Sequence, residues 1–339
     1  MSRTEDHLPV SDDDGQWFAV HDPSAAGAVR RTATAMAERA GLDAGQIADL
    51  AIVATEVATN LARHAVEGSV LVRMRRGAVS VGIELVAVDH GPGMTDALAF
   101  AVDGRSTAGS LGIGLGAIAR KSTAFDLYST PGVGTVLVAG VGGVAVEPEG
   151  GVTRPIVGEQ VCGDGYGGRW ADGRRQIILC DGLGHGPLAG LATQAALAEF
   201  QKAPADGPAG VLDYIHHRTR HTRGVVAGVA ELDWEVGVVR FAGVGNIVAS
   251  TVEQAGQRRT MVSMPGILGQ QRRDIRQFDY PLADGAIVVL HTDGLTDRWD
   301  LRGYPALLDH MPLLIAATLL RDAGKRRDDA AVLVAKRRQ

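Results

Sequence analysis

Four separated aspartates in the second half of the chain are the residues whose types and spacing most clearly indicate chemistry. They are Asp164, Asp181, Asp293 and Asp328, and each stands beside a glycine or a second acid. Asp181 and Asp293 each follow an apolar run typical of a buried strand, where a lone carboxylate is costly to desolvate. Several carboxylates converging there predict a hard cation held by oxygen ligands. The simpler alternative is a set of turn aspartates, but turns alone do not explain acids at the ends of apolar strands.

The first half of the chain has a different polar pattern. Glu56, Asn60 and His64 are spaced by four residues along one expected helix, so they project from one face of it. A carboxylate, a carboxamide and an imidazole on one face predict a site for a polar ligand. A solvated helix face would give the same spacing and remains the alternative.

Glycines supply the other two parts of that pattern. Asp89 is followed by Gly91 and Gly93, and an acid with two spaced glycines predicts a tight loop with room for a flat ligand. The carboxylate can accept a hydrogen bond from an adenine amino group, while the alternative is an ordinary turn at the end of a strand. The glycine-rich segment 109–116 opens a helix, where glycines and the helix N-terminus favour phosphate. It matches neither the Walker A nor the Rossmann pattern.

Helices and strands must position these side chains. Residue spacing and composition predict helices over residues 29–40, 47–65, 188–201, 211–219 and 312–322. Strands are predicted over residues 70–75, 79–89, 125–129, 135–141, 164–171, 175–181, 225–233, 236–244, 247–251, 287–291 and 330–336. Asp43 resembles the N-cap of the second helix.

Bulk composition limits the classes of protein to consider. The 339 residues suffice for two domains, and a hydrophobic fraction of 45% is ordinary for globular proteins. The net charge of −5 argues against a nucleic-acid partner, and no apolar run is long enough to span a bilayer. Two cysteines and no signal-peptide pattern lead us to expect a reduced, cytoplasmic protein.

The order of the motifs in the first half resembles that of the GHKL (Bergerat-fold) ATPases, in particular the serine kinases of RsbT type. The resemblance covers residues 18–139. It implies that Asn60 holds Mg²⁺ on the triphosphate of ATP, that Asp89 recognises adenine and that Glu56 is the general base acting on a serine hydroxyl. It also implies that Thr135 supports adenine recognition. Five glycines would shape the ATP pocket and its lid: Gly91, Gly93, Gly112, Gly114 and Gly116.

The order of the aspartates in the second half resembles that of the metal-dependent (PPM, type 2C) serine/threonine phosphatases, in particular their SpoIIE and RsbX branch. This resemblance covers residues 158–335. It implies that Asp181 bridges two Mn²⁺ or Mg²⁺ ions. The Gly182 carbonyl and Asp164 would bind one ion, and Asp293 and Asp328 the other.

His185 completes the residues expected to be catalytic, with Glu56 and Asp181. It follows Asp181-Gly182 after two intervening residues, and the resemblance implies that it protonates the leaving serine oxygen. The alternative is a loop histidine that lies near the site without a chemical role.

The expected fold class is α+β, with two domains in succession. We expect a disordered tail over 1–15, a Bergerat-type α/β sandwich that binds ATP over 16–141, a linker over 142–152 and a PPM-type β-sandwich flanked by helices over 153–337.

The two resemblances together imply a bifunctional regulator in a bacterial partner-switching pathway. It would phosphorylate and dephosphorylate serine or threonine on STAS-domain antagonist or switch proteins, with a sigma factor or an upstream sensor as a further partner. Since the segment 96–108 is short for a lid, the alternative is a metal-dependent phosphatase whose first domain only binds ATP or a sigma-factor partner. Simultaneous kinase and phosphatase action on one substrate would waste ATP, so we expect distinct substrates or reciprocal control.

Overall fold

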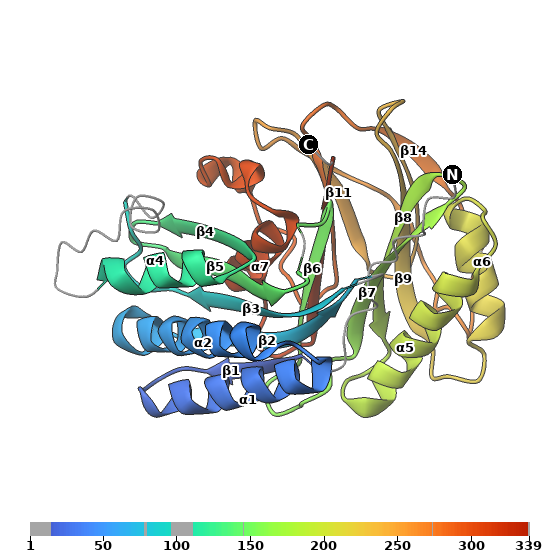
Figure 1. Ribbon diagram of the computed structural model, residues 1–339. Coiled ribbons are helices and arrows are strands. Elements are labelled where there is room, and N and C mark those ends of the chain that lie inside the picture. The colour runs from blue at the N-terminus through green and yellow to red at the C-terminus, as the bar shows by residue number, and fades with distance from the viewer. Residues whose placement is uncertain (1–14, 78–79, 96–110, 145, 273, 338–339) are drawn as a thin grey trace. The chain divides into compact units, whose positions relative to one another are not determined.

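The structure is a computed structural model that describes residues 15–77, 80–95, 111–144, 146–272 and 274–337 (Figure 1). Its contacts divide these residues into two compact units. We call them the first unit, with the described residues up to 146 together with 309–321, and the second unit, with 147–308 and 322–337. No helix among the described residues is long and apolar enough to cross a membrane.

The first unit is built on one five-stranded sheet with the strand order β1-β2-β3-β5-β4. Its strands are β1 (Gln16–Ala19), β2 (Ser69–Arg76), β3 (Val81–Asp89), β4 (Ala124–Thr130) and β5 (Gly134–Gly142). Its helices are α1 (Ser24–Ala40), α2 (Ala44–His64), α4 (Leu111–Lys121) and most of α7 (Pro312–Ala323). Asp43 and Gln46 form a capping box that fixes the start of α2, as the sequence predicted.

Both faces of this sheet are apolar. One face packs with helices α1, α2 and α4 in a core that includes Val53, Leu85 and Leu137. Strand register places a second set of side chains on the opposite face, and they are buried as well. The set is Leu71, Val86, Val88, Val136, Val138 and Tyr128. The sheet is therefore an inner layer of the first unit.

The second unit is a β-sandwich of two sheets. One sheet has the order β13-β10-β9-β8-β7, with β14 beside β10, and the other has the order β12-β11-β15-β16-β6. The first sheet consists of β7 (Asp164–Ala171), β8 (Arg174–Gly182), β9 (Val225–Asp233), β10 (Val238–Val244), β13 (Ser263–Met264) and β14 (Phe278–Pro281). The second consists of β6 (Glu149–Arg154), β11 (Val248–Val252), β12 (Arg258–Thr260), β15 (Ile287–His291) and β16 (Ala330–Lys336).

Two cores stabilise the sandwich. Side chains of both sheets, among them Tyr166, Phe241 and Leu333, form one core between them. Helices α5 (Pro187–Lys202) and α6 (Pro208–Arg218) cover the other side of the first sheet and form the second core. Layers of this kind confirm the expected α+β class with a helix-flanked β-sandwich.

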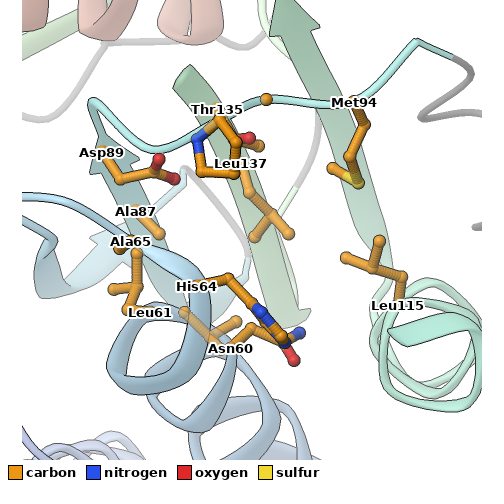
Figure 2. A pocket seen from close by; sticks show the side chains of 13 residues that line it. Asn60, Leu61, His64, Ala65, Ala87, Asp89, Met94, Leu115, Thr135 and Leu137 are labelled. Atoms are coloured by element: carbon orange, nitrogen blue, oxygen red, sulfur yellow. The ribbon is translucent and has the colours of Figure 1, made fainter. Parts of the chain in front are cut away.

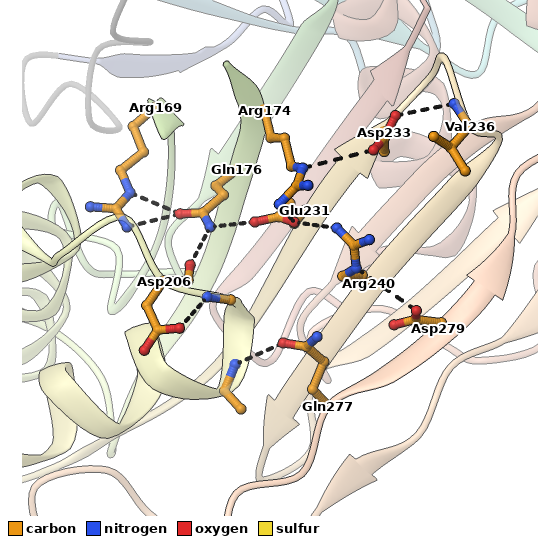
Figure 3. A network of polar contacts seen from close by, with 12 residues as sticks. Arg169, Arg174, Gln176, Asp206, Glu231, Asp233, Val236, Arg240, Gln277 and Asp279 are labelled. Atoms are coloured by element: carbon orange, nitrogen blue, oxygen red, sulfur yellow. Dashed lines mark hydrogen bonds and ion pairs between the residues drawn. The ribbon is translucent and has the colours of Figure 1, made fainter. Parts of the chain in front are cut away.

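A buried polar network holds the connection between α5 and α6 against the first sheet (Figure 3). Gln176 is fully buried, and its amide nitrogen donates to the Asp206 carbonyl at 2.7 Å and to Glu231 Oε2 at 2.8 Å. Arg169 donates to Gln176 Oε1, and Arg240 donates to Glu231 Oε1 at 2.7 Å. Since these buried groups satisfy one another, the network fixes the loop at little desolvation cost.

The segment expected as a linker differs from that expectation in its second half. Residues 149–154 form strand β6, which pairs with β16. A Cβ atom on Gly151 would lie 2.8 Å from the Tyr166 ring, and the Tyr166 hydroxyl donates to the Gly151 carbonyl at 2.7 Å. Close packing thus requires glycine at this position.

Candidate functional site

A cavity of about 140 Å³ lies in the first unit among α2, the end of β3, α4 and β5 (Figure 2). Asn60 and His64 line it from α2, Asp89 from β3 and Thr135 from β5. The structure therefore brings together polar residues that the sequence separates by 75 positions. Glu56 is not among the lining residues; it lies one helical turn before Asn60.

Asp89 is held in place by the loop that follows it. Its Oδ1 accepts a hydrogen bond from the Gly91 amide at 2.6 Å, and burial raises the pKa of its carboxyl group while that hydrogen bond opposes the rise. A Cβ atom on Gly91 would lie 2.7 Å from the His64 carbonyl, and one on Gly93 would lie 2.1 Å from the Thr130 carbonyl. These glycines allow the loop to approach α2 and β4 closely.

Asn60 has a donor available for a ligand. Its amide nitrogen is buried and has no hydrogen-bond partner among the described residues. Such a group is costly to leave unsatisfied, so its position on the cavity wall fits the oxygen atoms of a bound polar ligand. The cavity wall thus offers a donor at Asn60 and an acceptor at Asp89.

Three glycines of the segment 109–116 lie within a helix, and not in a loop that precedes it. Gly112, Gly114 and Gly116 are inside helix α4, whereas residues 96–110 lie outside the described residues. A Cβ atom on Gly114 would lie 2.6 Å from Glu56 Oε2 and 3.5 Å from the Asn60 amide. Glycine in a helix interior costs about 1 kcal/mol, so its use here is explained by the close approach of α4 to α2.

The aspartates of the second half meet where the two sheets of the sandwich end. Asp164 begins β7 and pairs with Asp181 near the end of β8, while Asp293 follows β15 and Asp328 precedes β16. The Thr292 hydroxyl donates to Asp164 Oδ2 at 2.7 Å and accepts from the Ala331 amide at 3.0 Å, which ties one sheet to the other.

Negative charge is concentrated at this point. Burial and the neighbouring Asp181 raise the pKa of the Asp164 carboxyl well above its usual range. Burial, Asp293 and Asp328 raise the pKa of Asp181 to about 7. Burial and Asp293 raise that of Asp328. Like charges that disfavour one another's ionised form are the arrangement that a bound cation would stabilise.

No group of three or more His, Cys, Asp or Glu side chains in the described parts of the chain has the geometry of a metal centre. The donor chemistry nevertheless fits a hard cation, because carboxylate oxygens predominate. Carboxylates repel each other when no compensating charge is present.

Neighbouring residues fix the acidic centre. From the sequence, Asn246 is expected in a structural turn near the site, and Asp329 is expected to bind through water or to cap a strand. Asn246 donates to Asp293 Oδ2 at 2.7 Å. Both oxygens of Asp329 accept backbone hydrogen bonds, from Ile156 at 2.7 Å and Gly163 at 2.8 Å, so Asp329 anchors the loop before β7.

Gly182 and His185 follow Asp181 along the chain. A Cβ atom on Gly182 would lie 2.2 Å from the Ala189 carbonyl, so only glycine allows α5 to begin so close to the acidic centre. His185 is exposed, and its Nδ1 lies 3.1 Å from Glu159 Oε1. This contact orients the imidazole ring through its Nδ1 atom.

Comparisons with known proteins match the two halves of the chain separately. The model of the histidine kinase-like ATPase domain matches residues 19–140, and that of stage II sporulation protein E (SpoIIE) matches residues 171–338. The serine/threonine-protein kinase RsbT of Bacillus subtilis (strain 168) is 30% identical over 112 residues, which are 33% of this chain and 84% of the relative. The phosphoserine phosphatase RsbX of the same organism is 21% identical over 138 residues, 41% of this chain and 69% of the relative.

A solved structure also shares the fold. It comes from work on the bacterial stressosome as a modular system adapted to control secondary messenger signalling, and it is 28% identical with a TM-score of 0.50. The match covers 56% of this chain and 98% of that one.

Proposed function

Since this chain belongs to the RsbT family of histidine kinase-like ATPase domains and joins that domain to a SpoIIE-type phosphatase domain, we propose that it both phosphorylates and dephosphorylates protein serine or threonine residues. Its substrates would be STAS-domain antagonist or switch proteins of a bacterial partner-switching pathway. A sigma factor or an upstream sensor would be a further partner.

One observation carries this proposal. The chain contains two chemically distinct sites, each with groups that a ligand would satisfy. One is a cavity in which the Asn60 amide nitrogen has no partner among the residues that the structure describes, and the other is a cluster of aspartates that raise one another's pKa. The first suits a nucleotide and the second suits divalent cations.

In the phosphatase reaction Asp164, Asp181, the Gly182 carbonyl, Asp293 and Asp328 would hold two Mn²⁺ or Mg²⁺ ions. The ions would supply a nucleophile at neutral pH and stabilise charge on the phosphoryl group. Thr292 and Asn246 orient two of the carboxylates through the hydrogen bonds described above. His185 would deliver a proton to the leaving serine oxygen, with Glu159 orienting its ring.

In the kinase reaction Asp89 would accept a hydrogen bond from the adenine amino group. The carbonyl oxygen Oδ1 of Asn60 would hold the Mg²⁺ that accompanies ATP, and its amide nitrogen would donate to a phosphate oxygen. Thr135, Gly91, Gly93, Gly112, Gly114 and Gly116 would shape the pocket. Glu56 would accept the proton of the substrate hydroxyl. Its carboxylate is directed to the space beside Gly114, which is near Asn60.

A second candidate is a metal-dependent phosphatase whose first domain only binds ATP or a sigma-factor partner. The observation in its favour is that Glu56 is not among the residues that line the cavity. ATP binding without transfer to any candidate substrate would select this function.

The first experiment measures phosphate release from a serine-phosphorylated antagonist protein, with and without Mn²⁺. We expect metal-dependent release by the wild type and its loss in Asp181→Ala. Phosphotransfer from ATP to the unphosphorylated substrate is measured in parallel, and Asn60→Ala should lose it while phosphate release persists. Intact phosphotransfer in Asn60→Ala would refute the assignment of the nucleotide site, and release without metal would refute that of the acidic centre.

A further inference from the structure

The first unit contains a segment from far along the chain. Residues 309–321 belong to it, although the chain on either side, up to 308 and from 322, belongs to the second unit. Helix α7 (Pro312–Ala323) therefore begins in one unit and ends in the other. Its side chains Leu314, Ile315 and Ala316 are fully buried, so the helix is an integral part of the fold.

Asp126 of β4 anchors the start of this segment. Its Oδ1 lies 2.7 Å from His310 Nδ1, and its Oδ2 accepts a hydrogen bond from the Met311 amide at 2.8 Å. The rings of Tyr128 and His310 meet edge to face, with centroids 5.2 Å apart. Since Asp126 and Tyr128 project to the face opposite Leu127, the segment lies on the sheet face away from α1 and α2.

Arg321 connects the end of the segment to the nucleotide cavity. It is 6% exposed, and its Nη1 donates to the backbone carbonyl of Asp89 at 3.4 Å. Asp89 is the residue whose carboxylate faces the cavity. A movement of Asp89 on ligand binding would therefore alter its hydrogen bond to the buried guanidinium group of Arg321, near the end of α7.

The residues directly after Arg321 make hydrogen bonds within the second unit that lead to the acidic centre. Asp322 accepts a hydrogen bond from the Tyr304 hydroxyl at 2.8 Å, and the Ala323 carbonyl accepts one from the Thr296 amide at 2.9 Å. The Lys325 amide donates to the Gly294 carbonyl at 2.6 Å, and its ammonium group donates to the Asp293 carbonyl at 2.5 Å. Three residues later the chain reaches Asp328.

We propose that Arg321 and α7 couple nucleotide binding at Asp89 to metal binding at Asp293 and Asp328. This inference rests on the proposed function, because it concerns the same two sites. The route depends on chain continuity. Arg321 donates a hydrogen bond to the Asp89 carbonyl, and the next residue, Asp322, accepts a hydrogen bond from Tyr304 within the second unit. A nucleotide that tightens the Arg321 contact orders residues 322–325, which lowers the conformational cost of metal binding.

Thermodynamic linkage makes this coupling reciprocal. If the nucleotide raises the affinity for Mn²⁺, Mn²⁺ must raise the affinity for the nucleotide by the same factor. Couplings between sites in proteins are typically about fivefold or more, which binding measurements resolve.

The test measures the affinity of the whole protein for the non-hydrolysable ATP analogue AMP-PNP, at fixed free Mg²⁺, with free Mn²⁺ buffered at zero or at saturation. We expect Mn²⁺ to tighten AMP-PNP binding about fivefold in the wild type. Asp181→Asn, which weakens the acidic centre, controls for Mn²⁺ bound to the nucleotide itself and should remove the tightening.

Arg321→Met removes the donors at nearly constant length and should also abolish the tightening, while Arg30→Met, on the exposed surface of α1, should retain it. Hydrogen exchange supplies a second measurement in the wild type, and AMP-PNP should slow exchange of the amides of 319–325. If Arg321→Met fails to fold, this measurement and the Mn²⁺ linkage in the wild type decide the question.

The outcomes separate this inference from the proposed function. AMP-PNP and Mn²⁺ that both bind but leave each other's affinity unchanged would overturn the coupling and leave the two activities standing. Tightening that persists in a folded Arg321→Met would overturn the route through α7. Absence of AMP-PNP binding, or of any Mn²⁺-dependent phosphate release, would overturn the proposed function and the coupling with it.

Discussion

Asp181 lies in an environment that differs strongly from its environment in the unfolded chain. Its carboxyl group has a pKa of about 7 in the folded protein without metal, because it is buried beside other carboxylates. An unfolded chain releases the same proton near pH 4. Between these values the folded state binds more protons than the unfolded state, so stability falls as the pH rises.

We therefore expect the melting temperature of the metal-free protein to fall between about pH 4 and pH 7, with a weaker fall in Asp181→Asn. At pH 7.5 the substitution should raise the melting temperature by about 2–4 °C for each kcal/mol of repulsion relieved. Thermal unfolding in EDTA at pH 5 and pH 7.5 measures both effects. Equal pH dependence in the two proteins would contradict the assignment of this charge to Asp181.

Adding a Cβ atom at Gly114 tests how the contact between α4 and α2 shapes the nucleotide cavity. In Gly114→Ala the new Cβ would lie 2.6 Å from Glu56 Oε2, so α4 must move away from α2. Such overpacking costs about 1–3 kcal/mol. If the binding free energy loses that amount, nucleotide affinity falls by about 5- to 150-fold.

The matched control for this substitution is Gly27→Ala in helix α1. There the new Cβ would meet only the mobile end of Arg31, at 3.1 Å. Both substitutions raise helix propensity, so a loss of AMP-PNP affinity confined to Gly114→Ala reports the contact with Glu56. Equal affinity in the two variants, measured by calorimetry, would show that this contact does not shape the site.

At the scale of elements, strand β6 joins the sandwich through a glycine that cannot be enlarged. Gly151→Ala would place a methyl group 2.8 Å from the buried ring of Tyr166. We expect the free energy of unfolding to fall by about 1–3 kcal/mol, measured by urea denaturation. Gly303→Ala is the control, because a Cβ there meets no described atom within 4 Å. A similar loss in both variants would mean that β6 packs loosely.

At the scale of the whole molecule, the first unit depends on a segment that the chain supplies only after residue 308. A fragment that ends at residue 146 lacks it, and the sheet face that bears Val86, Val136 and Val138 would meet water. We expect this fragment to bind the dye ANS and to aggregate, because a large exposed apolar patch favours association. A monomeric fragment that unfolds cooperatively would contradict this role of residues 309–321.

The sequence by itself determined the types and order of the chemical groups. Asp181 and Asp293 follow apolar runs, and the capping residue of α2 lies next to the helix that it caps. Strands can be predicted from alternating side chains. All of these signals depend on neighbours in the chain. The α+β class with two successive folds followed from them. The domain boundaries and the roles of the individual site residues remain predictions.

Only the tertiary structure decided which distant residues meet. The register of Asp164 with Asp181, the hydrogen bond from Thr292 and the pairing of β6 with β16 arise from long-range packing that no local period encodes. The same holds for Gly114, whose place inside a helix is explained by Glu56 on another element. Helix α7 has an ordinary helical sequence. Only the tertiary structure shows that it is divided between the two units, because that division depends on contacts with residues far away in the sequence.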